Sequence, residues 1–105
     1  MKKKIKFTTK AINILLAAID YKATQSSKEA ALLLQRLNRS VAGIAAFPNI
    51  GIKLQANDEK LTELRYIFSS GYIIFYRIDL DIIIEGIYST KQDYIKLLFE
   101  TPQRS

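Results

Sequence analysis

The chain has 105 residues, of which 16 are Lys or Arg and 10 are Asp or Glu, so its formal net charge is +6. Its hydrophobic content of 49% predicts a single packed domain spanning residues 1–105. The sequence contains no Cys and no His, which excludes disulfides, cysteine nucleophiles, Cys/His zinc sites and histidine acid–base catalysis. We therefore expect neither a metal nor a cofactor. No apolar run approaches the roughly 20 residues that span a bilayer, so we expect a cytoplasmic protein with no membrane partner.

The N-terminal charge is concentrated before the first acidic residue of the chain. The cluster consists of Lys2, Lys3, Lys4, Lys6 and Lys10. Such a cluster can steer a protein towards nucleic acid or towards an acidic protein segment. Lysines on an edge strand also discourage strand-to-strand aggregation, and the sequence leaves both interpretations open.

A strand and a helix begin the chain. Polar and apolar residues alternate over residues 4–7, as in a short half-buried strand. The hydroxyl of Thr8 or Thr9 can cap a helix that fades near residues 21–24. The apolar residues at helical spacing on one face of this helix are Ala11, Ile12, Leu15, Leu16 and Ile19.

A second, longer helix follows a capping box, in which Ser26 bonds the Glu29 N–H and Glu29 reaches back to Ser26. Pro48 ends it, because the residue before a proline is pushed out of the helical region. Its apolar stripe is Ala30, Leu33, Leu34, Leu37, Val41, Ile44 and Ala45. Its outward polar residues are Lys28, Gln35, Arg36 and Arg39. The two helices should form a helical hairpin over about residues 8–46.

The second half of the chain indicates turns and strands. Residues 48–51, Pro-Asn-Ile-Gly, have the chemistry of a turn, and residues 55–60 form a polar loop. Runs of β-branched and aromatic residues predict three strands, at about residues 61–69, 71–79 and 82–89. Residues 101–105 should fray.

This order of elements predicts an α+β fold. An N-terminal strand and a helical hairpin packed on a mainly antiparallel sheet of three or four strands would bury both helical stripes. A short C-terminal helix with Tyr94, Leu97 and Leu98 at helical spacing should dock on this body. The residues expected to be largely buried are Leu33, Leu37, Val41, Ile74, Tyr76 and Ile83.

Four segments in this order resemble the RelE/ParE toxin superfamily, most strongly its ParE branch, over nearly the whole chain. They are Phe-Thr-Thr-Lys-Ala at 7–11, Phe-Pro-Asn-Ile-Gly at 47–51, Glu-Leu-Arg at 63–65 with Ser-Gly-Tyr-Ile-Ile-Phe-Tyr-Arg at 70–77, and Ile-Glu-Gly-Ile-Tyr-Ser-Thr-Lys-Gln-Asp at 84–93.

The resemblance implies the toxin of a type II toxin–antitoxin, or plasmid stabilisation, system that a cognate antitoxin neutralises. Members of the ParE branch poison DNA gyrase, which would allow an indirect contact with DNA through that enzyme. Members of the RelE branch are ribosome-dependent mRNA endoribonucleases that use basic residues and a tyrosine on the sheet. An inactive homologue that acts only as a binding module is a further alternative.

The sequence departs from the ribonuclease pattern at three positions. Phe68 and Ile73 stand where basic residues are common in the superfamily, and Ser89 stands where many members have His. Since clustered cations are needed to stabilise a developing phosphorane, the resemblance favours a gyrase-binding toxin without catalytic residues. The residues that would serve the ribonuclease alternative are Arg65, Lys91 and Tyr94.

The residues most suited to contact the target lie near the C-terminus. They are Lys91, Lys96, Leu97, Leu98 and Arg104. Arg65 could instead pair with Glu63 or Glu85, and Arg77 should flank the turn at Asp79. The remaining candidates are Tyr66, Tyr72 and Tyr76, which should be core or half-buried residues whose hydroxyls need partners.

Overall fold

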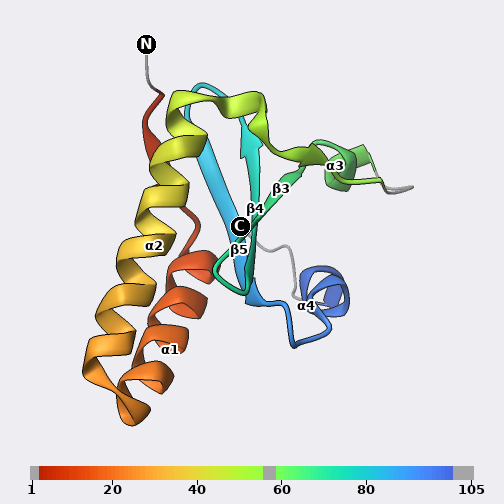
Figure 1. The fold of residues 1–105 in the computed structure, drawn as a ribbon. Coiled ribbons are helices and arrows are strands. Elements are labelled where there is room, and N and C mark those ends of the chain that lie inside the picture. Colours follow the sequence, from red (N-terminus) through yellow and green to blue (C-terminus); the bar gives the residue numbers. More distant parts are fainter. Residues whose placement is uncertain (1–2, 56–58, 101–105) are drawn as a thin grey trace.

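The computed structural model describes residues 3–55 and 59–100, and Figure 1 shows their arrangement. The elements in chain order are β1 (Ile5–Phe7), α1 (Thr9–Gln25), α2 (Ser27–Ala46), the 3-10 turn η1 (Pro48–Ile50), β2 (Ile52–Lys53), α3 (Glu59–Thr62), β3 (Arg65–Ser69), β4 (Tyr72–Ile78), β5 (Ile82–Ser89) and α4 (Tyr94–Glu100). The predicted α+β fold, with its helical hairpin and short C-terminal helix, is confirmed. None of the helices within these ranges is both long and apolar enough to cross a membrane.

The sheet has five strands in the order β1-β5-β4-β3-β2. β1 runs parallel to β5, and the other three pairings are antiparallel. The sequence predicted three or four strands because β2 has only two residues, too few to show a periodic pattern. The predicted strand over 61–69 begins later, at Arg65, since residues 59–62 of the expected loop and strand form α3.

The helical hairpin is held by two hydroxyl caps. The Thr8 hydroxyl accepts from the Ala11 N–H at 3.0 Å, and α1 runs through Gln25, slightly further than predicted. The Ser26 hydroxyl accepts from the Glu29 N–H at 3.1 Å, which confirms half of the capping box. The return bond from Glu29 is absent because the Ser26 N–H already donates to the Lys22 carbonyl at 3.0 Å. Ser26 therefore ends α1 and starts α2, which keeps the connection between the helices to one residue.

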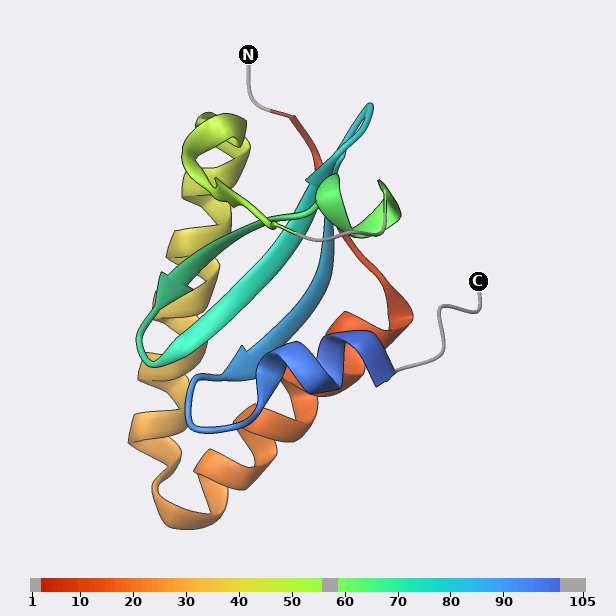
Figure 2. The same cartoon turned by 90° about the vertical axis from the view of Figure 1, so that its right-hand side faces the viewer.

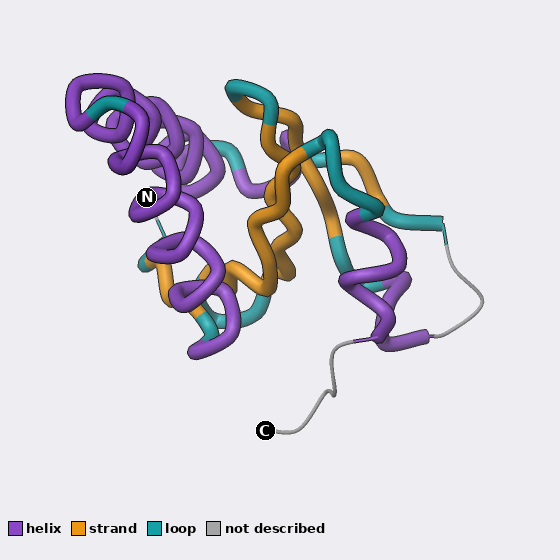
Figure 3. Tube along the Cα trace, turned by 90° about the horizontal axis from the view of Figure 1, so that it is seen from below, coloured by secondary structure: helices purple, strands orange, loops and turns teal. Residues whose placement is uncertain are grey.

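Two apolar cores lie on opposite faces of the sheet, as Figures 2 and 3 show: α1 and α2 cover one face, and α3 and α4 lie on the other. We call these the hairpin face and the second face. The hairpin-face core comprises Ala11, Leu15, Leu33, Leu37, Val41, Ile44, Ile74, Tyr76, Ile82, Ile84 and Ile87. The second-face core comprises Leu64, Ile73, Phe75, Tyr88 and Leu98.

Five of the six residues expected in the core are buried, and Ile83 is not. Ile82 and Ile84 point to the hairpin face, so Ile83 points to the second face beside Arg77, where it is half-buried and outside both clusters. In α1, Ile12 and Leu16 are exposed and Leu34 of α2 is at the edge of exposure. The apolar helical stripes are thus wider than the surface that the sheet covers.

Two irregularities shape the strands that carry the candidate residues. The β3–β4 connection is a two-residue turn with positive φ at Ser70 (54°) and Gly71 (81°), as a type I′ hairpin requires. In β5 the register shifts so that Tyr76 faces Ile84 while Phe75 faces Gly86, which leaves Glu85 as the extra residue of a β-bulge.

Candidate functional site

Arg65 and Tyr76 hold the turn after α2 against the sheet. The buried Tyr76 hydroxyl donates to the Pro48 carbonyl at 2.6 Å and accepts from the Gly51 N–H at 2.8 Å. Arg65, directly across from Tyr76 on β3, donates to the Gly51 carbonyl at 2.8 Å. These three bonds attach η1 and β2 to the sheet. Pro48 and Gly51 of the Pro-x-x-Gly segment therefore serve to fix this turn on the sheet.

Gly51 is required here for space. Its backbone is extended, at φ −74° and ψ 153°, which any residue adopts. A Cβ atom at this position would lie 2.5 Å from the Tyr76 hydroxyl oxygen and 2.7 Å from a ring carbon. The ring is fixed by its own hydrogen bonds, so a larger residue would have to displace the turn.

Arg77 is fixed by two acidic residues at the β4–β5 end of the sheet. Its Nε donates to the Glu85 carboxylate at 2.6 Å, and its Nη1 lies 3.5 Å from the Asp79 carboxylate. The hydrogen bond with Glu85 is the main cause that raises the pKa of Arg77. The expected place of Arg77 beside the Asp79 turn is confirmed.

The alternative pairing of Arg65 with Glu63 or Glu85 is wrong. Glu85 pairs with Arg77, and the ion pairs among the residues that the structure describes do not include Arg65. Arg65 and Arg77 nevertheless line one open hollow of about 580 Å³. Its other lining residues are Lys53, Thr62, Glu63, Ile78 and Asp79.

The second face is apolar at Phe68 and Ile73, the two positions at which the ribonuclease alternative led us to expect basic residues. Ile73 is buried with Phe75, Tyr88 and Leu98 beneath α4. Phe68 is 58% exposed and meets Tyr66 edge-on, with ring centroids 5.8 Å apart. Apolar and aromatic side chains thus occupy these positions on the second face of the sheet.

Lys10 lies near this second core, a placement that sequence reasoning missed. Its Nζ is 5.9 Å from the centroid of the Tyr88 ring, within range of a cation–π interaction. Burial lowers the pKa of Lys10, and the nearby charge of Glu85 partly opposes that shift. Lys10 is the second residue of α1 and Tyr88 lies near the end of β5, so only the packing of α1 beside β5 could reveal this contact.

The structure does not bring the three ribonuclease candidates together. Arg65 faces the hairpin side with Tyr76, whereas Tyr94 packs on the second-face core, with its ring centroid 6.4 Å from that of Phe75. Lys91 is exposed in the loop between β5 and α4, where its backbone N–H donates to the Ser89 hydroxyl at 3.2 Å.

The C-terminal target candidates differ in accessibility. Lys91 and Lys96 are exposed, Leu97 is half-buried, and Leu98 is only 2% exposed because it fills the second core. Arg104 and the expected frayed end, 101–105, lie outside the described residues.

The N-terminal lysines contact the β4–β5 turn. Lys3 Nζ donates to the carbonyls of Asp79 and Leu80 at 3.3 and 3.2 Å. Lys6 Nζ lies 3.1 Å from the Asp81 carboxylate. Lys2 lies outside the described residues. These contacts favour the structural interpretation of the N-terminal charge over a free basic arm.

An apolar patch is exposed at the β2 edge of the sheet. Phe47, Ile50 and Ile52 are 69%, 60% and 59% exposed, and we call them the β2-edge patch. Among the described strands β2 pairs with β3 alone, so its outer edge faces away from the sheet. Large apolar side chains that gather on a surface mark interaction sites.

A sequence comparison and a structure comparison each find similar proteins. The sequence model described as the ParE toxin of the type II toxin–antitoxin system parDE matches residues 5–94. A comparison with curated protein sequences finds no significant match. The fold is similar to a chain of the chromosomal ParDE toxin–antitoxin system from P. aeruginosa, with 18% identity, a TM-score of 0.68, and 84% of this chain and 96% of that chain covered.

It is also similar to a chain of the RelBE2 toxin–antitoxin complex from Mycobacterium tuberculosis, with 17% identity and a TM-score of 0.59. That match covers 85% of this chain and 99% of the other. At these identities the neighbours show the shared fold. The family model, which spans most of the chain, shows that the protein belongs to the ParE toxin family of type II toxin–antitoxin systems.

Proposed function

We propose that this toxin stops growth by binding and stabilising a gyrase–DNA state, with no bond chemistry of its own. The observation that carries the proposal is the apolar second face. Ile73 is buried under Leu98 and Tyr88 in the place where phosphate-stabilising cations would be needed. Electrostatic catalysis of phosphoryl transfer requires several cations preorganised around one phosphate.

The two arginines on β3 and β4 have structural partners. Arg65 is bonded to the Gly51 carbonyl, and Arg77 is bonded to Glu85 and Asp79. Diverting either guanidinium to a phosphate would break a contact that holds the sheet together. This supports a toxin that acts by binding.

The exposed cations of the C-terminal region suit the rim of a target interface. Lys91 and Lys96 are accessible, and rim charges chiefly alter association rate and salt dependence. Leu97 is half-buried, so it can contribute apolar area at the margin. Leu98 can serve as an anchor only if α4 leaves the second core. Arg104 remains a candidate at this end of the chain.

A cognate antitoxin is the partner that family membership implies, and we place it at the β2-edge patch. An extended segment can add a strand beside β2 and cover Phe47, Ile50 and Ile52. Lys53, exposed on the same strand, favours an acidic segment. An apolar centre with a charged rim is the composition of a specific interface.

Induced expression of the toxin tests the target. We expect filamentation, the DNA-damage response and trapped gyrase cleavage complexes. Primer extension on translated message provides the opposing measurement: codon-positioned cuts that disappear in Lys91→Ala would identify a ribonuclease. Growth arrest with intact supercoiling and no trapped complexes would reject gyrase, and unaffected growth would identify an inactive homologue that only binds.

A further inference from the structure

The positive charge of the molecule is divided between cations that have acidic or carbonyl partners and cations that do not. Around the β4–β5 turn, Lys3, Lys6 and Arg77 are held by the Asp79, Asp81 and Glu85 groups or by turn carbonyls. Charge that is neutralised in this way attracts a polyanion weakly. An electrostatic surface must therefore be sought elsewhere.

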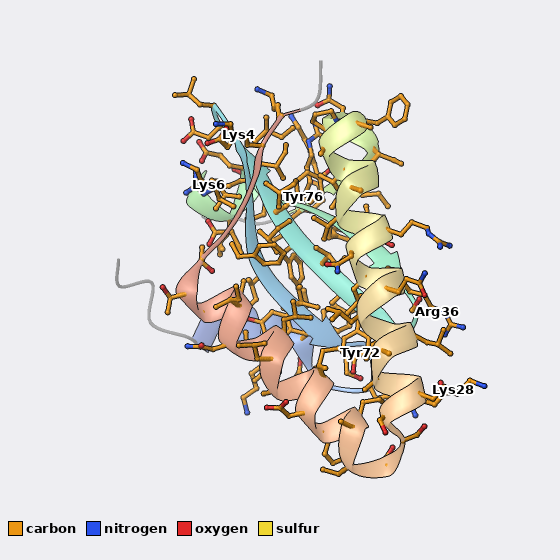
Figure 4. The ribbon with its side chains drawn as sticks, turned by 90° about the vertical axis from the view of Figure 1, so that its left-hand side faces the viewer. Lys4, Lys6, Lys28, Arg36, Tyr72 and Tyr76 are labelled. Atoms are coloured by element: carbon orange, nitrogen blue, oxygen red, sulfur yellow. The ribbon has the colours of Figure 1, made fainter. Side chains whose placement is uncertain are left out.

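The outward side of α2 carries such a surface. Lys28, Gln35 and Arg39 are seven and four residues apart, which places them on one side of the helix, with Arg36 next to them. We call these four residues the α2 stripe. All four are exposed, and Figure 4 shows Lys28 and Arg36 projecting away from the body, at the opposite end of the molecule from Lys4 and Lys6.

The stripe is not explained by the stability of the helix. Glu29 is the one acidic residue of α2, and the ion pairs among the described residues include none of the three cations. Lys28 lies in the first turn, where the helix dipole disfavours a positive charge. From Lys28 to Arg39 the stripe extends about 16 Å, at 1.5 Å per residue.

We propose that the α2 stripe binds the phosphate backbone of duplex DNA. Guanidinium and ammonium groups with an amide between them suit phosphate oxygens, and backbone contacts need no apolar surface. A protein partner would instead need an apolar centre, which the β2-edge patch has and the stripe lacks. The inference goes beyond gyrase poisoning, because it concerns DNA binding by the toxin alone.

Fluorescence anisotropy of a labelled 20-base-pair duplex, measured with purified toxin from 50 to 200 mM salt, tests the proposal. The stripe variant is Lys28→Gln/Arg36→Gln/Arg39→Gln. The matched control is Lys4→Gln/Lys22→Gln/Lys53→Gln, which removes the same charge from other surfaces. Each phosphate contact contributes about 0.9 to the slope of log affinity against log salt. We expect the stripe variant to lose a slope of about 2 to 3 and at least about tenfold in affinity at 50 mM salt.

The control should weaken binding less than about threefold. Equal losses in the two variants would assign binding to net charge and overturn the proposal. So would the absence of duplex binding by the unaltered toxin at 50 mM salt, or displacement of the duplex by polyglutamate at equal charge. Chemical-shift mapping of the unaltered protein decides the same question without a variant: shifts centred on α2 support the stripe, and shifts centred on β1 or α4 refute it.

Discussion

Tyr76 shows how a single hydroxyl can organise a segment distant in sequence. Its bonds to Pro48 and Gly51, with the bond from Arg65 to Gly51, replace the ladder that the two-residue strand β2 cannot supply. Because the Tyr76 side chain packs directly against the backbone of this turn, a single carbon atom added at Gly51 would disturb the turn.

Gly51→Ala should destabilise the protein by about 1–3 kcal/mol, since the new Cβ would overlap the Tyr76 ring. Gly43→Ala is the matched control. Gly43 lies within α2, and apart from its chain neighbours and the backbone of its own helix no atom lies within 4 Å of its would-be Cβ, so alanine should leave stability unchanged or raise it by about 0.5–1 kcal/mol. Urea unfolding of both variants measures the difference. Equal midpoints for the two would contradict the close approach.

Tyr76→Phe should cost about 1–3 kcal/mol near neutral pH, because it leaves the Gly51 N–H and the Pro48 carbonyl unsatisfied. Burial raises the pKa of Tyr76 above its ordinary 10.0, against smaller opposing effects of the Gly51 hydrogen bond and the Arg65 charge. The neutral phenol therefore contributes stability below pH 10 that is lost as pH rises through the folded-state pKa.

The measurement is the free energy of unfolding of both proteins between pH 7 and pH 11. The gap between wild type and Tyr76→Phe should narrow above pH 10. A gap that stays constant would refute the assignment. Tyr21→Phe, at an exposed position of α1, should change stability little across the range.

At the scale of elements, α4 is a structural part of the second core. Leu98 packs with Ile73, Phe75 and Tyr88, and Tyr94 and Leu97 surround it. We expect truncation after Asp93 to abolish toxicity, yet it would also uncover this core. Loss of toxicity on truncation would then mix two effects, a loss of target contacts and a loss of fold.

Leu98→Ala measures how much the stability of the fold depends on the packing of α4. It should destabilise the protein by about 2–5 kcal/mol, the usual range for a buried leucine. Ile95→Ala, on the exposed side of the same helix, should stay within about 0.5 kcal/mol of wild type. Thermal unfolding followed by circular dichroism gives both values. If Leu98→Ala unfolds like wild type, α4 is only lightly docked and truncation becomes a clean test of toxicity.

At the scale of the whole molecule, apolar and charged surfaces are separated. The β2-edge patch lies at one edge of the sheet, and the α2 stripe lies on the outside of the hairpin. This separation permits a protein partner and a polyanion to be bound by different surfaces. Substitutions on one surface should leave the other intact.

Ile50→Asp tests the protein-binding surface. We expect it to weaken co-purification with the antitoxin encoded by the adjacent gene by about 30-fold, the effect of losing an interface hot spot. Asn49→Asp places the same charge one residue away on an exposed polar position and should leave the complex intact. Size exclusion after coexpression makes the comparison. Equal retention of the antitoxin by both variants would move the interface away from β2.

The helical hairpin, the three-strand meander and the C-terminal helix could all be predicted from the sequence. Each depends on local signals: the 3.6-residue apolar period, the hydroxyl caps at Thr8 and Ser26, Pro48 as a stop, and β-branched runs between turn residues. The resemblance to toxins was also readable, because its segments are continuous in the chain. These predicted elements are present in the structure because the apolar pattern, the capping residues and the turn residues all favour the same local structure.

Contacts between side chains that are distant in the sequence could be read only from the folded structure. It showed that β2 is a strand, since a two-residue strand exists only through its partner β3. It assigned Arg65 to Gly51 and Glu85 to Arg77, because register and a bulge set these distances. It also buried Leu98 in the second core, although the sequence had left this residue as a candidate for contact with the target. Sequence periodicity gives the face of an element, whereas contacts between distant residues depend on how elements pack.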